Sequence, residues 1–89
     1  MNRIYADDPL ESLANFHGYM SRKLVENYHK SGWRLDSVKS LRRRVDQELE
    51  ELDKAIAAGK PYEVIAREAA DVANMVMMIQ DRFWPVPHD

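Results

Sequence analysis

Residues 68–79, Glu68-Ala-Ala-Asp71-Val-Ala-Asn74-Met-Val-Met-Met-Ile79, form the stretch of sequence that decides the fold. Around a helical wheel its apolar residues face almost every direction, which is typical of a helix that is buried on all sides. The polar exceptions, Glu68, Asp71 and Asn74, lie along one edge of this helix because residues three apart are neighbours on a helix surface. Buried carboxylates without partners are costly, so this edge is expected to face cationic groups.

An earlier helix is predicted over residues 9–30. Asp8 suits the N-cap, Pro9 suits the first helical position, and Glu11 completes an arrangement like a capping box. Apolar residues then recur at helical spacing as far as Tyr28. Gly32 provides a plausible stop signal after this helix.

Another apolar stripe predicts a helix over residues 37–58, for which Asp36 or Ser37 can serve as the cap. Gly59 is suited to a left-handed helix end, and Pro61 is suited to open the next helix, over residues 61–83. Residues 84–89 are expected to form an extended tail. The short connection predicts that the helices over 37–58 and 61–83 pack as an antiparallel hairpin.

The predicted fold class is therefore all-α, a helical bundle built on this hairpin and completed by oligomerisation. The 89 residues allow a single domain, residues 1–89. Two neighbours within one chain cannot easily surround the apolar helix over 61–83, so some of its small and methionine side chains are expected to face another subunit. A homodimer or a dimer of dimers is the expected assembly.

Composition narrows the functional class. The chain is 45% hydrophobic and 31% charged, has no cysteine, and carries a net charge of -2, which argues against general nucleic-acid binding and against a thiolate metal site. The N-terminus has no apolar run like that of a signal peptide, and no stretch is long enough to span a bilayer. We expect a cytoplasmic protein with no membrane partner.

Two acidic pairs are the candidate site. Glu48 and Glu51 flank the apolar stripe of their helix at i,i+3 spacing, and in an antiparallel hairpin they can converge with Glu68 and Asp71. A site with only oxygen ligands suits Mg²⁺, with Mn²⁺ as a second possibility. The competing interpretation is structural, because such pairs commonly form salt bridges on helix surfaces, here with Arg44, Arg67 and Arg82.

The segments Gln47-Glu48-Leu-Glu-Glu51 and Glu68-Ala-Ala-Asp71 resemble the ExxE and ExxD metal motifs of the all-α nucleoside triphosphate pyrophosphatases, the MazG-like group. The resemblance covers about residues 24–83. It implies a helical dimer or tetramer that binds Mg²⁺ through Glu48, Glu51, Glu68 and Asp71. It also implies hydrolysis of a nucleoside triphosphate to the monophosphate and pyrophosphate. The family often has two adjacent glutamates at the start of its first motif, and here Gln47 replaces the first of them.

Bound Mg²⁺ neutralises phosphate charge and lowers the pKa of a coordinated water, which leaves a carboxylate to act as base. Glu48 or Glu51 is the candidate for this catalytic role, and spacing does not decide between them. Two other interpretations stay open. The chain can be a catalytically silent oligomer that binds metal or nucleotide, which Gln47 favours, or a purely structural helical dimer.

Four residues are candidates for substrate binding, each with a structural alternative. Trp33 can stack on a base or close the core under its turn. Lys30 and Arg34 belong to a basic cluster with Lys23 and Lys39 that can contact phosphates or complement a helix dipole. Asn74 can bond a sugar hydroxyl or a neighbouring backbone group. The preferred base and sugar, the pathway and the choice between dimer and tetramer are not determined by the sequence.

Overall fold

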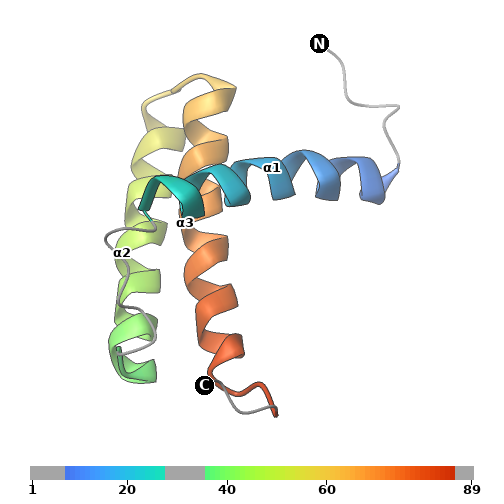
Figure 1. Ribbon diagram of the computed structural model, residues 1–89. Coiled ribbons are helices and arrows are strands. Elements are labelled where there is room, and N and C mark those ends of the chain that lie inside the picture. The colour runs from blue at the N-terminus through green and yellow to red at the C-terminus, as the bar shows by residue number, and fades with distance from the viewer. Residues whose placement is uncertain (1–7, 28–35, 86–89) are drawn as a thin grey trace.

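The structure is a computed structural model that describes residues 8–27 and 36–85, and its helices are α1 (Pro9–Asn27), α2 (Val38–Ala57) and α3 (Tyr62–Asp81). Helices α2 and α3 run antiparallel, side by side, and α1 crosses them (Figure 1). No strand occurs among the described residues. The predicted all-α class and the α2/α3 hairpin are confirmed.

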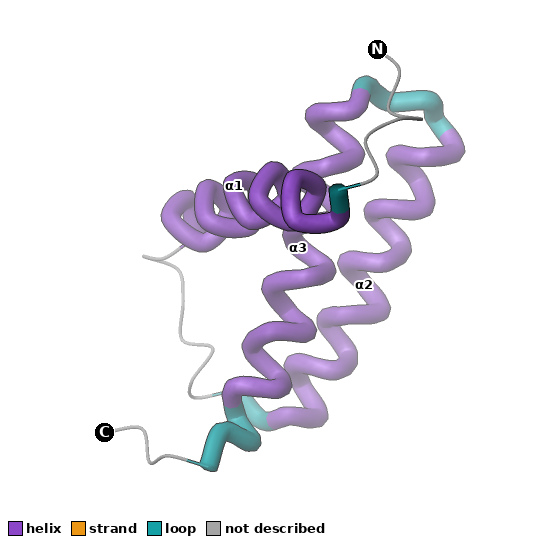
Figure 2. Tube along the Cα trace, turned by 90° about the vertical axis from the view of Figure 1, so that its right-hand side faces the viewer, coloured by secondary structure: helices purple, strands orange, loops and turns teal. Residues whose placement is uncertain are grey.

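Helix α3 forms the middle of the arrangement. It packs against both α1 and α2, and Figure 2 shows α1 on one side of α3 and α2 on the other. The C-terminal half of α1 lies over the hairpin, whereas its N-terminal half projects beyond it (Figure 1). Consequently α3 is the element through which the other two helices are held together.

The hairpin begins and ends at residues whose local chemistry stops or starts a helix. Ser37 is the N-cap of α2, and its hydroxyl accepts a hydrogen bond from the Ser40 N–H at 3.0 Å. Gly59 has a φ of 65°, which glycine adopts without steric cost, and it ends α2 just after Ala57. Pro61 is the N-cap of α3 and not its first helical residue, so α3 begins one residue later than predicted.

The outer ends of the bundle differ from prediction by a few residues. The Asp8 carboxylate accepts from the Leu10 N–H at 2.9 Å, as expected of the N-cap of α1. The described part of α1 ends at Asn27, and residues 28–30 lie outside the described residues. Helix α3 ends at Asp81, two residues before the predicted end, because the N–H groups of Phe83 and Trp84 bond to carbonyls three residues back.

The core lies where α2 begins and α3 approaches its end. Leu41 and Val45 of α2 are buried against Met75 and Met78 of α3, and the partly buried side chains packed around them are Leu24, Met77 and Ile79. Closer to the α2/α3 turn the buried side chains are small: Ala55, Ala66 and Ala70. Small side chains at a contact let two helix axes approach closely.

Within the single chain, helix α3 is not covered on all sides, and its burial by a second subunit stays a prediction. Ala66, Ala70, Met75 and Met78 are buried within the chain, whereas Val76 is half exposed. The stripe of α2 is likewise exposed toward its end, at Leu49 and Ile56. Among the described residues, no helix combines the length and the apolar character needed to cross a membrane.

We predict that Leu41→Ala lowers the free energy of unfolding by about 2 to 5 kcal/mol, because it empties a fully buried position in the core. Leu49→Ala, on the same helix but 40% exposed, is the matched control and is expected to cost less than about 1 kcal/mol. Urea unfolding followed by circular dichroism measures both values. Equal losses in the two variants would contradict the core described above.

Candidate functional site

Three of the four predicted carboxylates lie midway along the hairpin, between the alanine contacts and the Leu41/Met75 core. Glu48 is on α2, Glu68 and Asp71 are on α3, and all three are partly buried. Burial, followed by the negative charges of Asp71 and Glu68, raises the pKa of Glu48 above its ordinary value. The structure therefore places these three groups in one electrostatic neighbourhood.

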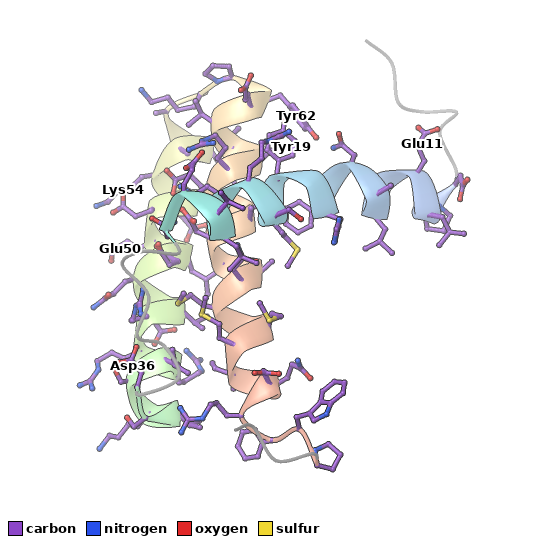
Figure 3. The ribbon with its side chains drawn as sticks, viewed as in Figure 1. Glu11, Tyr19, Asp36, Glu50, Lys54 and Tyr62 are labelled. Atoms are coloured by element: carbon purple, nitrogen blue, oxygen red, sulfur yellow. The ribbon has the colours of Figure 1, made fainter. Side chains whose placement is uncertain are left out.

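Glu51, the fourth predicted ligand, lies on the outer surface. Its side chain is 54% exposed and its carboxylate is 3.4 Å from the Lys54 ammonium, which is also 3.6 Å from Glu50. Figure 3 shows Glu50 and Lys54 on the side of α2 away from α3. In the part of the chain that the structure describes, no three His, Cys, Asp or Glu side chains are arranged to hold one metal ion.

Asp71 has a cationic partner from α1. The Lys23 Nζ lies 3.5 Å from the Asp71 Oδ2, and both side chains are largely buried, with 16% and 22% of their surfaces exposed. Burial raises the pKa of Asp71, and the positive charge of Lys23 offsets part of that effect. The expectation that the edge of α3 faces a cation is thus met by Lys23.

A second ion pair joins α1 to α3 beside the first. The Arg67 guanidinium donates two hydrogen bonds to the Glu26 carboxylate, at 2.7 and 3.0 Å. These hydrogen bonds hold the pKa of Glu26 below its ordinary value. Because Lys23 is also 3.8 Å from Glu26, the two pairs form one network that spans the contact between α1 and α3.

Arg44, Arg67 and Arg82 were considered as partners for the predicted carboxylates. In the structure, Arg44 and Arg82 both contact Asp36 instead. Arg44 lies 3.4 Å from the Asp36 carboxylate, and Arg82 donates to the Asp36 carbonyl oxygen. Arg67 binds Glu26. From the sequence, Lys23 was placed in a cluster that can contact phosphates, and its contact with Asp71 was not predicted. Its position next to Leu24, on the apolar stripe of α1, could have indicated that Lys23 lies close to the neighbouring helices.

Asn74 is buried, and its side-chain N–H donates to the Met20 carbonyl of α1 at 3.1 Å. The backbone alternative of the two predicted roles is therefore the one observed. The Asn74 Oδ1 is buried without a described protein partner. The other predicted substrate-binding residues, Trp33, Lys30 and Arg34, lie outside the described residues.

Aromatic contacts anchor α1 farther along its length. Tyr19 packs edge to face on Tyr62, with ring centroids 6.0 Å apart, and Figure 3 shows the two side chains together where α1 crosses α3. The Asn15 amide donates to the Tyr62 hydroxyl at 2.6 Å, and the Arg22 guanidinium lies over the Tyr19 ring. Polar and aromatic contacts thus hold α1 in place, although none of its described residues is fully buried.

No protein-family model, curated protein or solved structure matches the chain. The functional argument therefore depends on the chemistry of this site and on the resemblance of its two motifs. Glu48, Glu68 and Asp71 supply oxygen donors of the kind that hard divalent cations prefer. The positive charges of Arg44 and Lys23 act on Glu48, and those of Lys23 and Arg67 act on Asp71, so cations offset part of this negative charge.

We predict that Glu48→Gln stabilises the metal-free protein at pH 7 by roughly 0.5 kcal/mol, the size of a solvent-screened charge interaction. The pKa of Glu48 is raised in the folded state, so its ionised form opposes folding above that pKa. The penalty disappears as the pH falls below the ordinary value of 4.5, and the advantage of the variant should disappear with it.

Urea titrations between about pH 4 and pH 7 test this dependence. Glu50→Gln is the matched control, because it removes the same charge from an exposed position of α2 that contacts Lys54. It should bring no stabilisation at any pH. A gain for Glu48→Gln that did not change with pH would show that Glu48 does not experience the described repulsion.

Proposed function

We propose that the protein is a Mg²⁺-dependent nucleotide pyrophosphohydrolase that cleaves a nucleoside or deoxynucleoside triphosphate to the monophosphate and pyrophosphate. The observation that supports the proposal is that the negative charges of Asp71 and Glu68 on α3 act on the partly buried Glu48 of α2. These residues belong to the two motifs that resemble those of the MazG-like pyrophosphatases. A nucleotide pool in the cytoplasm is the proposed source of substrate.

The chemistry of the donor set suits a hard divalent cation. Among the described residues these side chains are not arranged around one ion, so binding requires them to turn toward each other. The donor set contains only carboxylate oxygens, and a cationic group already lies 3.5 Å from Asp71 in the form of the Lys23 ammonium. Glu51 is one turn from Glu48 on the same helix, so it joins the set if its side chain leaves Lys54 and turns toward α3. Mn²⁺ is the alternative ion, because it accepts the same ligands.

In this proposal Glu48, Glu51, Glu68 and Asp71 hold the ion, and the hairpin fixes their relative positions. When bound, Mg²⁺ supplies charge neutralisation for the phosphates and acidifies a coordinated water. Glu48 or Glu51 accepts the proton of the attacking water. The side chain of Glu48 is partly buried, whereas that of Glu51 is 54% exposed. In the proposal, Glu51 is therefore the carboxylate that can move during turnover.

A specific observation favours the structural alternative, in which the chain is a helical dimer without a metal. The Lys23–Asp71 contact already neutralises one of the buried charges and ties α1 to α3. The silent binding protein, which Gln47 favours, is the third candidate. Metal-dependent thermal stabilisation separates the binding protein from the structural dimer, and release of pyrophosphate separates the enzyme from both.

We predict that Glu48→Gln, Glu51→Gln, Glu68→Gln and Asp71→Asn each reduce pyrophosphate release by at least about tenfold, the loss expected when a metal ligand or a catalytic base is removed. All four should remain folded without metal. Glu48→Gln and Glu68→Gln lower the repulsion within the cluster, whereas Glu51→Gln and Asp71→Asn each remove a single ion pair, with Lys54 and Lys23 respectively. A panel of nucleoside and deoxynucleoside triphosphates at saturating Mg²⁺ supplies the assay.

Glu50→Gln is again the control, since this residue lies between the two motif positions on α2 but contacts Lys54 at the surface. It should retain the activity of the original protein. Near-normal turnover in all four site variants would refute the assignment of the site, and inactivity of the unmodified protein toward the whole panel would refute the enzyme.

We also propose that the chain assembles as a homodimer or a dimer of dimers. Support comes from its large exposed apolar side chains, which include Leu10 and Leu13 on the projecting half of α1 and Val76 on α3. A standard protein interface buries about 800 Å² per partner. The accessible surface of the chain is 6836 Å², so an interface of this size would cover only a small part of it. Bringing these side chains together removes apolar surface from water.

Light scattering on the purified protein should therefore give a mass of about two or four chains at micromolar concentration, as expected for an interface of that class. Replacing both Leu10 and Leu13 with Ser should shift the mass toward the monomer if α1 contributes to the interface. A helical monomer in the unmodified protein would exclude this assembly.

A further inference from the structure

Helix α2 carries its charges in a polarised order. Residues 38–47 contain four basic residues and one acidic residue, whereas residues 48–57 contain one basic residue and four acidic ones. The helix dipole does not account for this order, because it favours acidic groups near a helix N-terminus and basic groups near the C-terminus. The first turn of α2 has no acidic residue and contains Lys39. The stability of the isolated helix therefore leaves the order unexplained.

The exposed side of α2 contains a stripe of residues that follows this order. We define the outer stripe by its spacing of three and four residues, which places its members along one face of the helix: Arg42, Asp46, Leu49, Asp53 and Ile56. All five are exposed, and the two apolar members expose 40% and 55% of their surfaces. Helix α2 lies on one side of α3 and α1 on the other (Figure 2). The outer stripe is therefore an accessible surface in which apolar side chains lie between opposite charges.

The ion pair within the outer stripe is local and open to solvent. Arg42 lies 2.8 Å from Asp46, and both side chains are more than half exposed. Exposed pairs of this kind contribute little to stability, so either charge can exchange its partner at small cost. The basic residue also precedes the acidic one, which is the less favourable order for a pair on a helix. The charges of the outer stripe are thus available to a partner molecule.

We propose that the outer stripe is the contact surface for a second copy of the chain, with the two α2 helices antiparallel about a two-fold axis at their midpoints. In this arrangement Arg42 of each copy lies beside Asp53 of the other, and the symmetry forms that pair twice. The two Leu49 side chains lie close to the axis and are removed from water. Electrostatic complementarity sets the direction of the pairing, and the apolar side chains add to its affinity.

The order of charges favours a second copy as the occupant. A surface that complements the outer stripe must be acidic opposite Arg42 and basic opposite Asp53, and α2 itself presents that order when its direction is reversed. In a parallel pairing like charges would meet, which is costly. The inference rests on the proposed assembly, for which it names a surface separate from the apolar side chains of α1 and α3. It does not depend on the metal site. A dimer of dimers needs two kinds of interface, and the outer stripe supplies one.

Charge reversal tests the pairing, with association measured by analytical ultracentrifugation and helicity by circular dichroism. Arg42→Glu and Asp53→Lys each place like charges opposite each other twice, so each should weaken the association at least about tenfold. The double variant Arg42→Glu/Asp53→Lys exchanges the two charges and restores opposite charges at both contacts. It should associate within about threefold of the unmodified protein.

Mixing the two single variants gives a further test without any new substitution. The acidic stripe of one variant then faces the basic stripe of the other, so an equimolar mixture should associate although neither variant does so alone at the same concentration. Arg22→Glu is the matched control, because it reverses an exposed charge on α1 and should change the association by less than about twofold. Unchanged helicity in every variant shows that the fold is retained.

Cross-linking tests the antiparallel direction. The chain has no cysteine, so a single introduced thiol reports on one position. Leu49→Cys lies near the axis and should join two copies through a short bis-maleimide. Ile56→Cys should not, because the two thiols are about 25 Å apart along the helices at 1.5 Å per residue. A parallel pairing would cross-link both variants.

The outcomes separate this inference from the proposed assembly. Multimers of unchanged mass and affinity in Arg42→Glu and Asp53→Lys, or a double variant that fails to associate, overturn the pairing and keep the assembly. Equal cross-linking through Leu49→Cys and Ile56→Cys does the same. An unmodified protein that sediments as a monomer at micromolar concentration refutes both. Charge-dependent pairing in a protein that releases no pyrophosphate supports the pairing and refutes the enzyme.

Discussion

The burial of α3 between two helices is the constraint on which the rest of the structure depends. Its small and sulfur-containing side chains supply much of the core, as Ala70 and Met75 illustrate, yet the same helix carries Asp71 along one edge. A carboxylate in that position requires a nearby positive charge, because desolvation penalises its ionised form. The opposing helix α1 provides that charge through Lys23.

This requirement makes α1 different in kind from the hairpin. Helices α2 and α3 share buried apolar side chains, led by Leu41. Helix α1 adds the partly buried Leu24 to this core and is otherwise attached by ion pairs, one buried amide and an aromatic contact. Solvent-accessible ion pairs weaken as ionic strength rises, because mobile ions screen their charges. The contact between α1 and α3 is therefore the part of the molecule whose strength responds most directly to ions.

The acidic site and the stability of the protein are coupled for the same reason. Glu48, Glu68 and Asp71 gain nothing for the fold by lying together, since like charges in a partly buried gap repel. Proteins retain such arrangements where function requires them, and carboxyl groups with shifted pKa values, such as Glu48 and Asp71, support a functional hypothesis. In the motif that this part of α2 resembles, an acidic residue often stands at the position of Gln47, so Gln47 bears on the proposed activity.

The sequence by itself determined the elements of this fold. Asp8, Ser37 and Gly59 act through bonds to their own neighbours, so helix starts and stops can be recognised from local chemistry, and the short α2/α3 connection leaves little choice but a hairpin. Helical spacing likewise identified the two acidic pairs. It did not reveal that Glu51 contacts Lys54 on the outer surface.

Only the tertiary structure decided which charges meet. The partner of Asp71 comes from α1, 48 residues earlier in the chain, and depends on how α1 crosses α3, which no local pattern encodes. The same crossing joins Arg67 to Glu26 and Asn74 to Met20. Side-chain spacing along a helix reports which residues share a face, whereas the identity of the facing residue is set by the packing of separate helices.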